Sequence, residues 1–518
     1  MRVAVVGAGF SGLIWAERIR RQGHDVVVFE KAADLGGVWR SFANRGSRVQ
    51  MVAADYDFWE RPRPRGADRP VDFTPRDAIV AEARAFATHT GVAGCIRFST
   101  EVLGIESDAD GATLRVASGG EVSEERFDAV AVLPGTLTRP RSLPLRDEAV
   151  FEGTVARGIA DDVDPAAFAG RRVVIVGMGS YAIENAREAL EHGAAHVTLV
   201  ARSFNVVAPK VASLRIANRL VWKGQGVVDT LRAPYEALGR TDLLAKLQDR
   251  ATRSQRTIPP ISDLYFIAQR FGRLTVLQDE VDRALPCGVA LASGVVLEAD
   301  VLLGCIGFER TATADRLSAM LGPAELNGMF VDRQRHVAFN FEPVHGGMDA
   351  DEGIPFASHL TITRTLADLF VYYLERPEAH ARIRERLPTV RDAAAFSGAD
   401  YQALFRLVAE DPDARAIVLH HLAAKVARCE RRSPESAFLA ENRADWARLC
   451  TAMGGDEADF PYPFTPEPAA RRRLEALAMQ AWSGWRRWRV FGRGSLAPAP
   501  LEGQRGSVAV GGRRVTSA

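Results

Sequence analysis

The chain has 518 residues, which at roughly 100–200 residues per domain predicts three or four domains. Its 47% hydrophobic and 25% charged residues are typical of a globular protein rather than a disordered or fibrous one. The 66 basic and 65 acidic residues leave a formal net charge of +1. That balance excludes a general nucleic-acid binder, because such a protein needs a basic excess to neutralise phosphates.

The five cysteines form no C-x-x-C pair, so we expect neither a dithiol redox centre nor a metal site. An odd, sparse cysteine count suits a reducing compartment. The N-terminal apolar run enters glycines rather than a signal-peptide cleavage site. No apolar run approaches the ~20 residues of a transmembrane helix. We therefore expect a soluble, cytoplasmic protein without a transmembrane segment.

The first thirty residues predict a strand over 3–6, a helix over 13–21 and a second strand over 25–29. The turn between the first strand and the helix has the pattern G-x-G-x-x-G. Its glycines permit a tight turn, a close approach of the backbone to a pyrophosphate, and close packing of helix on strand. An acid directly after the second strand stands where a carboxylate accepts from ribose hydroxyls. The predicted dinucleotide-binding residues are Gly7, Gly9, Phe10, Ser11, Gly12 and Glu30.

A second glycine motif, Gly36-Gly37-Val38-Trp39, begins six residues after Glu30. Two adjacent glycines clear space for a flat group to approach the backbone. An ordinary turn before a packed tryptophan would give the same pattern. Because the motif directly follows a dinucleotide fingerprint, it points to FAD rather than NAD, with Gly37, Val38 and Trp39 at the site.

A second strand–turn–helix–strand unit occupies residues 173–200. Its turn again has small residues at the fingerprint positions, with alanine third. An arginine rather than a carboxylate follows the second strand, and a guanidinium binds the 2′-phosphate that a carboxylate would repel. The predicted NADPH-binding residues are Gly177, Gly179, Ser180, Tyr181, Ala182 and Arg202. The sequence thus predicts an α/β fold with two Rossmann-like dinucleotide-binding domains, in which NADPH gives a hydride to FAD.

These motifs resemble the class B flavoprotein monooxygenases, which include the flavin-containing monooxygenases and their Baeyer–Villiger relatives. Residues 151–157 are similar to the family linker F-x-G-x-x-x-H, with Arg157 in place of histidine. Residues 132–135 are similar to the family's A-T-G segment. Residues 300–308 resemble the strand that returns to the FAD domain and ends in A-T-G-Y. The resemblance spans roughly residues 1–375 and adds Val102, Gly135 and Gly307 to the expected cofactor-binding residues.

The resemblance implies an FAD- and NADPH-dependent monooxygenase that inserts one atom of O2 into a small organic substrate through a C4a-(hydro)peroxyflavin. The reaction is then N- or S-oxygenation or Baeyer–Villiger oxidation. Gln50 best matches the aspartate of Baeyer–Villiger enzymes and Asn44 is the nearest asparagine, so both are catalytic candidates. Each is equally explained as a polar loop residue bonded to the backbone. The absent linker histidine leaves open a flavoprotein reductase or oxidase without oxygen insertion, and a non-enzymatic redox sensor.

The chain order implies a discontinuous FAD-binding domain over 1–155 and 300–377, with an inserted NADPH-binding domain over 156–299. Residues 378–494 predict a helical C-terminal region. Within it Trp482, Trp485 and Trp488 recur at a spacing of three, which is more typical of a terminal helix docked on its own domain than of membrane contact. Residues 495–518 have the composition of a disordered tail.

Overall fold

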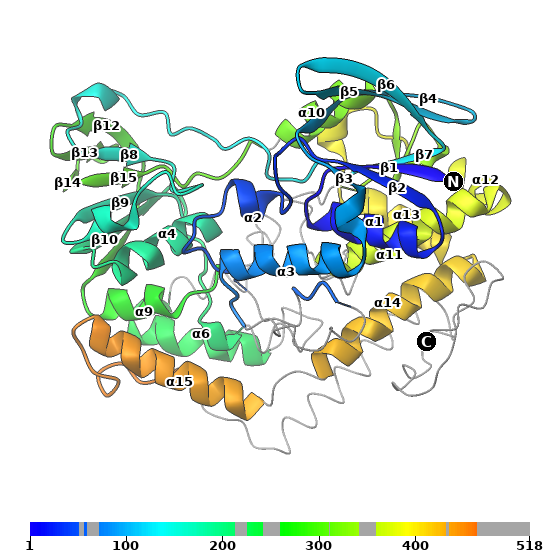
Figure 1. The fold of residues 1–518 in the computed structure, drawn as a ribbon. Helices are drawn as coiled ribbons and strands as arrows, with labels where there is room; N and C mark the ends of the chain where they lie inside the picture. Colours follow the sequence, from blue (N-terminus) through cyan, green and yellow to red (C-terminus); the bar gives the residue numbers. More distant parts are fainter. Residues whose placement is uncertain are drawn as a thin grey trace.

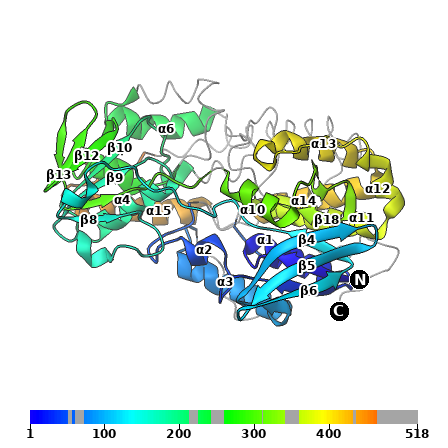
Figure 2. The ribbon, with the colours of Figure 1, turned by 90° about the horizontal axis from the view of Figure 1, so that it is seen from above.

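The computed structural model describes residues 1–50, 56–59, 72–212, 225–241, 260–309, 311–340, 359–430 and 435–463. They form two α/β units that lie side by side, with the C-terminal helices along one edge of both (Figures 1 and 2). The predictions about the tryptophan stripe and the tail concern residues outside this part of the chain.

The first unit is built on a seven-stranded sheet with the order β16-β17-β18-β7-β1-β2-β3. The five strands from β18 to β3 pair in parallel, while β16, β17 and β18 pair antiparallel. Short apolar runs suit these strands because helices cover both faces of a parallel sheet. The strands are β1 (Arg2–Val6), β2 (Asp25–Phe29), β3 (Ile96–Arg97), β7 (Ala129–Val132), β16 (Leu326–Asn327), β17 (Phe330–Val331) and β18 (Gln334–Phe339).

A three-stranded antiparallel sheet and seven helices complete the first unit among the described residues. In this unit α1 packs against α11 and α10 packs against β4. The elements are β4 (Thr100–Asp108), β5 (Gly111–Ser118), β6 (Glu121–Phe127), α1 (Phe10–Arg21), α2 (Val38–Ser41), α3 (Arg76–His89), α10 (Ala312–Leu321), α11 (His359–Glu375), α12 (Pro377–Arg384) and α13 (Gly398–Val408).

The second unit is built on a five-stranded parallel sheet with the order β11-β10-β9-β15-β8. A three-stranded antiparallel sheet lies beside it. The elements are β8 (Thr154–Ala156), β9 (Arg172–Val176), β10 (His196–Ala201), β11 (Leu274–Gln278), β15 (Val301–Leu303), β12 (Val281–Leu285), β13 (Gly288–Leu291), β14 (Val296–Glu298), α4 (Ser180–Glu191), α6 (Gln225–Ala237) and α9 (Asp263–Arg270). The predicted α/β fold with two Rossmann-like units is confirmed.

One boundary differs from the sequence prediction. The strand Val301–Leu303 was expected to return to the first sheet, but it lies between β9 and β8 in the second. Gly153 allows this pairing, because a Cβ atom there would lie 2.3 Å from the carbonyl oxygen of Asp300. The first unit therefore resumes beyond Phe308, with α10, and β8 already belongs to the second unit.

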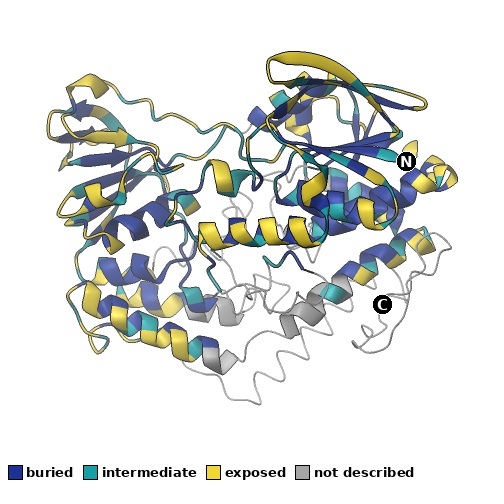
Figure 3. Ribbon diagram, viewed as in Figure 1, coloured by how far each residue is buried: buried dark blue, intermediate teal, exposed yellow. Residues whose placement is uncertain are grey.

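The described part of the C-terminal region is helical, and it packs on both units. Helix α14 (Pro412–Glu430) packs against α11 of the first unit, and α15 (Glu435–Ala452) packs against α9 of the second. The buried face of α15 meets the second unit's core through Trp446, which is fully buried and donates from Nε1 to the carbonyl oxygen of Phe460 at 2.8 Å (Figure 3). Within the described ranges, no helix has the length and apolar character needed to cross a membrane.

We predict that Trp446→Ala lowers the free energy of unfolding by about 3–5 kcal/mol, because it leaves a cavity and an unpaired carbonyl oxygen at the α15 contact. Thermal unfolding measures the effect. The matched control is Arg448→Ala on the exposed face of the same helix, which removes an exposed ion pair with Asp445 and should change the stability by less than about 1 kcal/mol. Equal losses in the two variants would contradict the assigned packing.

Candidate functional site

The turn after β1 has a geometry that only glycine permits. Gly7 has φ of +104°, and a Cβ atom on it would lie 2.6 Å from the carbonyl oxygen of Leu133. A Cβ atom on Gly12 would lie 1.8 Å from the carbonyl oxygen of Gly7. Helix α1 then begins at Phe10, so its free N–H groups lie at the carboxyl end of the sheet. This is the arrangement that binds a pyrophosphate.

Glu30 lies beside this turn at the end of β2. Its Oε2 accepts from the amide of Ala8 at 2.7 Å, and its Oε1 accepts from the amide of Ala32 at 2.8 Å. These bonds fix the carboxylate, and each oxygen keeps a second lone pair for a ribose hydroxyl. The predicted ribose contact is therefore compatible with the structure.

The double glycine lies directly against the first turn. The amide of Gly36 donates to the carbonyl oxygen of Ala8 at 3.1 Å, and a Cβ atom on Gly37 would lie 3.0 Å from Cα of Gly9. Gly37 also has φ of +55°. The two backbone segments thus lie in direct contact, and neither glycine contributes a side chain to the space beside this contact.

Aromatic side chains stand beside that space. The indole N–H of Trp39 donates to the hydroxyl of Tyr56, and the ring of Phe10 lies 5.5 Å from that of Tyr56 and 4.4 Å from that of Phe58. Val38 opens α2, and Val102 is buried in β4. The cradle, the fixed acid and the aromatic neighbours all fit FAD.

The turn after β9, like the turn after β1, has a geometry that only glycine permits. Gly177 has φ of +124°, and a Cβ atom on it would lie 2.3 Å from the carbonyl oxygen of Cys305 in the loop after β15. Helix α4 begins at Ser180. Ala182 is fully buried in that helix, where its small side chain permits close packing on the sheet.

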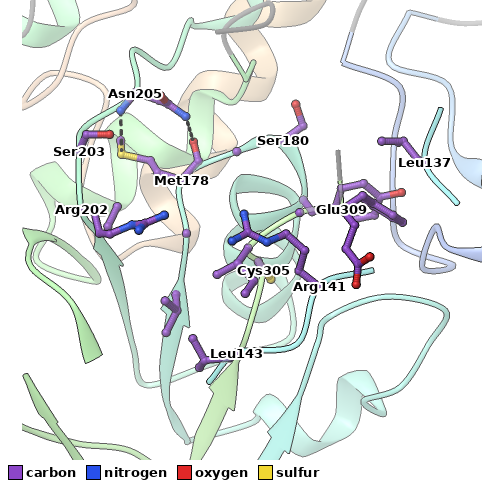
Figure 4. A pocket seen from close by; sticks show the side chains of 18 of the residues that line it. Leu137, Arg141, Leu143, Met178, Ser180, Arg202, Ser203, Asn205, Cys305 and Glu309 are labelled. Atoms are coloured by element: carbon purple, nitrogen blue, oxygen red, sulfur yellow. Dashed lines mark hydrogen bonds between the residues drawn. The ribbon is translucent and has the colours of Figure 1, made fainter. Parts of the chain in front are cut away.

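A pocket of about 780 Å³ opens at the carboxyl ends of β9, β10 and β15 (Figure 4). The predicted residues that line it are Gly177, Gly179, Ser180, Tyr181, Arg202 and Gly307. Its wall also includes Thr136 and Leu137 from the loop after β7, and the segment 393–397 from the C-terminal region. Both units therefore share one pocket, and the C-terminal wall was not anticipated from sequence.

Arg202 is exposed and extends into this pocket (Figure 4). Its carbonyl oxygen accepts from Nε2 of Gln278 at 3.2 Å, but its guanidinium has no hydrogen bond or ion pair with any described residue. Two carboxylates, Asp279 and Glu280, also line the pocket. The Asp279 carboxylate is held by the hydroxyl of Ser293 and the amide of Glu280, and these bonds lower its pKa. The free guanidinium is available for an anion such as a 2′-phosphate.

An aromatic row crosses from one unit to the other at the pocket. The ring of Phe308 lies 5.2 Å from that of Phe42, which caps α2, and 5.5 Å from that of Tyr181 at the start of α4. Burial raises the pKa of Tyr181, so its phenol stays protonated at neutral pH. The row thus joins the two units, and Tyr181 and Phe308 within it line the pocket.

Asn44 hydrogen-bonds across the interface between the two units. Its Nδ2 donates to Oδ1 of Asn185 at 3.3 Å and to Oε2 of Glu188 at 3.2 Å, and its Oδ1 accepts from the amide of Asp161 at 3.0 Å. The side chain is buried and does not line the pocket. These contacts favour a structural role over direct catalysis.

Gln50 makes similar contacts at the start of α4. Its Nε2 donates to Oε1 of Glu184 at 3.2 Å and to the carbonyl oxygen of Ser180 at 3.4 Å. Its Oε1 accepts from the amide of Ile261 at 3.4 Å. The side-chain amide of Gln50 is thus hydrogen-bonded to residues of the second unit.

The charged face of α4 completes this interface. The guanidinium of Arg187, which is buried, donates to the carbonyl oxygen of Gly46 at 2.6 Å and to Oε2 of Glu184 at 2.8 Å. Burial raises the pKa of Glu188, which the nearby Arg187 only partly offsets. No contact of this kind was predictable from the loop sequence alone.

Arg157, which replaces the family's linker histidine, donates to Oγ of Ser142 at 3.1 Å. It is absent from the pocket wall. Its contact ties β8 to the segment after β7. Within the described residues, no three His, Cys, Asp or Glu side chains are grouped as metal ligands would be.

We predict that Glu188→Gln raises the thermal midpoint at pH 8, with a gain that shrinks toward pH 5. Because burial raises the pKa of Glu188, the folded protein binds that proton more tightly than the unfolded chain. Wild-type stability therefore falls as the pH rises from the unfolded pKa through the raised folded pKa, and glutamine lacks this loss. Glu191→Gln, which replaces an ion-paired carboxylate on the same helix, should not raise the midpoint at pH 8. A gain independent of pH would refute the assignment.

Two kinds of comparison place this geometry among known proteins. A family model described as FMO-like, flavin-binding monooxygenase-like, matches residues 1–214. A 4-hydroxybenzoate brominase (decarboxylating) from Marinomonas mediterranea is 29% identical over 210 residues, which cover 40% of this chain and 40% of that protein. A Baeyer–Villiger monooxygenase from Streptomyces coelicolor is 26% identical over 344 residues, which cover 60% of this chain and 65% of that protein. The chain therefore spans less than two thirds of the length of either relative.

Among solved structures, an oxidised steroid monooxygenase bound to NADP is similar, with a TM-score of 0.54 and 19% sequence identity. The match covers 77% of this chain and 93% of that one. At this identity the likeness concerns the fold, and it extends the two-unit architecture beyond the N-terminal match. Residues 1–214, which carry both glycine fingerprints, match the flavin-binding monooxygenase-like family model.

Proposed function

We propose that this protein is an FAD-dependent, NADPH-consuming monooxygenase that transfers one atom of O2 to a small organic substrate. The observation that carries the proposal is the pocket shared by the two units. Its wall combines the second glycine turn and Arg202 with Thr136 and Leu137 from the first unit. A dinucleotide held at the second turn would thus extend toward a flavin held at the first.

The residues of each unit fit the cofactor assigned to it. Gly9 and Gly37 carry no side chain that would block a cofactor at the first turn, and the fixed carboxylate of Glu30 can accept from its ribose. The free guanidinium of Arg202 suits the extra phosphate of NADPH. When bound, the two cofactors supply the hydride transfer and the reaction with dioxygen, and the protein supplies binding, orientation and exclusion of water.

The chain's own contribution to the chemistry is to exclude water and to fix the distance between the units. The rings of Phe42, Phe308 and Tyr181 contact one another from one unit to the other beside the pocket. When the cofactors are bound, a dry site would favour oxygen transfer to the substrate over release of hydrogen peroxide after the reaction with O2. The hydrogen bonds of Asn44 and Gln50 keep α4 in register with the first unit.

The substrate we propose is a small ketone, amine or thioether. Leu137, Ala393 and Phe396 contribute apolar side chains to the pocket wall. Apolar side chains of this kind suit the hydrocarbon part of such a molecule.

Anaerobic reduction followed by exposure to oxygen tests the proposal. The purified protein is expected to bind FAD, and NADPH should bleach the flavin absorbance without oxygen. On admission of O2 with a panel of ketones, amines and thioethers, oxygenated product should form in proportion to the NADPH consumed. Stoichiometric hydrogen peroxide with every compound would favour the reductase or oxidase alternative. Failure to bind FAD at all would exclude both enzymes and leave the redox sensor.

Arg202→Ala is expected to raise the KM for NADPH by about 10- to 100-fold, because one charge-assisted contact to the 2′-phosphate is lost. The KM for NADH should change by less than about twofold. Steady-state kinetics with both nucleotides measure the two effects. Arg171→Ala, at the amino end of β9 and away from the pocket, is the matched control and should change neither value. Equal losses for both nucleotides would contradict the role of Arg202.

A further inference from the structure

A second arginine, Arg141, reaches the pocket from the opposite wall. It belongs to the segment that leaves β7 and runs to the second unit, and it lines the pocket with Leu143 and Pro144 of the same segment. In Figure 4 its guanidinium and that of Arg202 extend into the pocket from different sides. The wall therefore presents two cations to whatever occupies it.

The backbone at Arg141 is fixed in place. Its amide donates to the carbonyl oxygen of Gly307 at 2.9 Å, and the amide of Glu309 donates to the carbonyl oxygen of Arg139 at 2.9 Å. Pro140 forms an antiparallel bridge with Phe308 between these two bonds. The segment is thus pinned to the loop after β15, and the side chain of Arg141 projects from a rigid base.

The guanidinium groups of the neighbouring arginines form ion pairs or hydrogen bonds, whereas that of Arg141 forms none with the described residues. Arg139 pairs with Glu309 at 2.8 Å and with Asp315 at 3.3 Å, and Arg157 donates to Ser142. The guanidinium of Arg141 has no ion pair or hydrogen bond with a described residue, although Arg141 lies between occupied neighbours. An unpaired guanidinium held in a pocket is suited to an anionic ligand.

The order of the strands indicates which anion it meets. Along the carboxyl edge of the second sheet β10, β9 and β15 follow one another. Arg202 follows β10, the glycine turn follows β9, and Arg141 is pinned to the loop after β15. In this fold the pyrophosphate of a dinucleotide lies at the glycine turn, against the N-terminus of the helix that follows. The 2′-phosphate lies farther out, beyond the second strand.

We propose that Arg141 binds the pyrophosphate of NADPH and closes the anion site opposite the N-terminus of α4. This inference rests on the proposed function, because it takes the nucleotide to be NADPH. The two arginines would then bind different phosphate groups of the same nucleotide. Arg141 contributes to every nicotinamide dinucleotide, whereas Arg202 contributes only where a 2′-phosphate is present. Arg141 also couples the nucleotide to the segment leaving the first unit.

Equilibrium binding to the oxidised, FAD-loaded protein tests this division without turnover. Isothermal titration calorimetry with NADP+, NAD+ and adenosine 2′-monophosphate gives three dissociation constants for each variant. Arg141→Ala should raise the dissociation constants of NADP+ and NAD+ by the same factor, about 10- to 100-fold. The dissociation constant of adenosine 2′-monophosphate should change by less than about twofold. Arg202→Ala should weaken NADP+ and adenosine 2′-monophosphate and spare NAD+. Arg141→Lys, which keeps the charge but not the fork of donors, should fall between wild type and Arg141→Ala.

Arg171→Ala again serves as the control for loss of a surface charge, and an unchanged thermal midpoint in Arg141→Ala checks that the segment still folds. Wild-type affinity for NADP+ in Arg141→Ala would overturn the inference while leaving the proposed function intact. An equal loss of affinity for adenosine 2′-monophosphate and for NADP+ would also overturn it, since that result would place Arg141 on the 2′-phosphate. A wild-type protein that binds neither dinucleotide would overturn both.

Discussion

The contact between residues 44–50 of the first unit and the buried polar flank of α4 decides where the rest of the site can lie. Helix α4 carries the second glycine turn at its start, and its flank buries Glu184, Asn185, Arg187 and Glu188 against the first unit. Asn44 and the carbonyl oxygen of Gly46 satisfy these groups. A Cβ atom on Gly46 would lie 2.2 Å from a carboxylate oxygen of Glu188, so a side chain there would displace that carboxylate.

This interface contributes more to the relative orientation of the two units than to the net free energy of folding. Burying charged groups carries a desolvation cost that their attraction only roughly offsets, whereas removing one partner costs several kcal/mol. An apolar contact would hold the units together and still permit sliding. A network with fixed donors and acceptors allows one orientation, and in that orientation Thr136 and Leu137 face the second glycine turn. The polar interface is therefore better suited to fixing the pocket's shape than to adding stability.

Local signals in the sequence were sufficient for the two glycine turns. The first was predicted with a strand over 3–6, and the structure has Arg2–Val6, because the constraints at Gly7 and Gly12 involve residues close in the chain. The helix expected within residues 173–200 is α4, which begins at Ser180. The contacts of Asn44 and Gln50 join residues more than 110 positions apart, so the motif that singled them out carried no information on their partners.

The positions of Val301–Leu303 and Arg141 could not be predicted for the same reason, because they depend on pairing between residues far apart in the chain. A short apolar strand fits either parallel sheet equally well, and the structure pairs this one with β8 and β9 of the second sheet. Arg141 is one of many arginines in the chain and stands in no motif. Its position in the pocket follows from pairing with Gly307, more than 160 residues away. Residues in glycine motifs could thus be assigned from sequence, and residues positioned by pairing between the units could not.

The C-terminal region extends the restraint on the two units. Helix α14 is anchored in the first unit through His421, whose Nε2 lies 2.9 Å from Oδ2 of Asp368. Helix α15 is anchored in the second, where Nδ2 of Asn442 donates to the buried carboxylate of Asp263 at 2.8 Å and Lys210 pairs with Asp445 at 2.6 Å. Burial raises the pKa of Asp263, and its hydrogen-bond donors offset part of the free-energy cost of burying the carboxyl group. Because residues 393–397 of the same region line the pocket, a shift of either unit would move a pocket wall as well as the interface. The region that lies outside the recognisable motifs is therefore part of what keeps the shared pocket in shape.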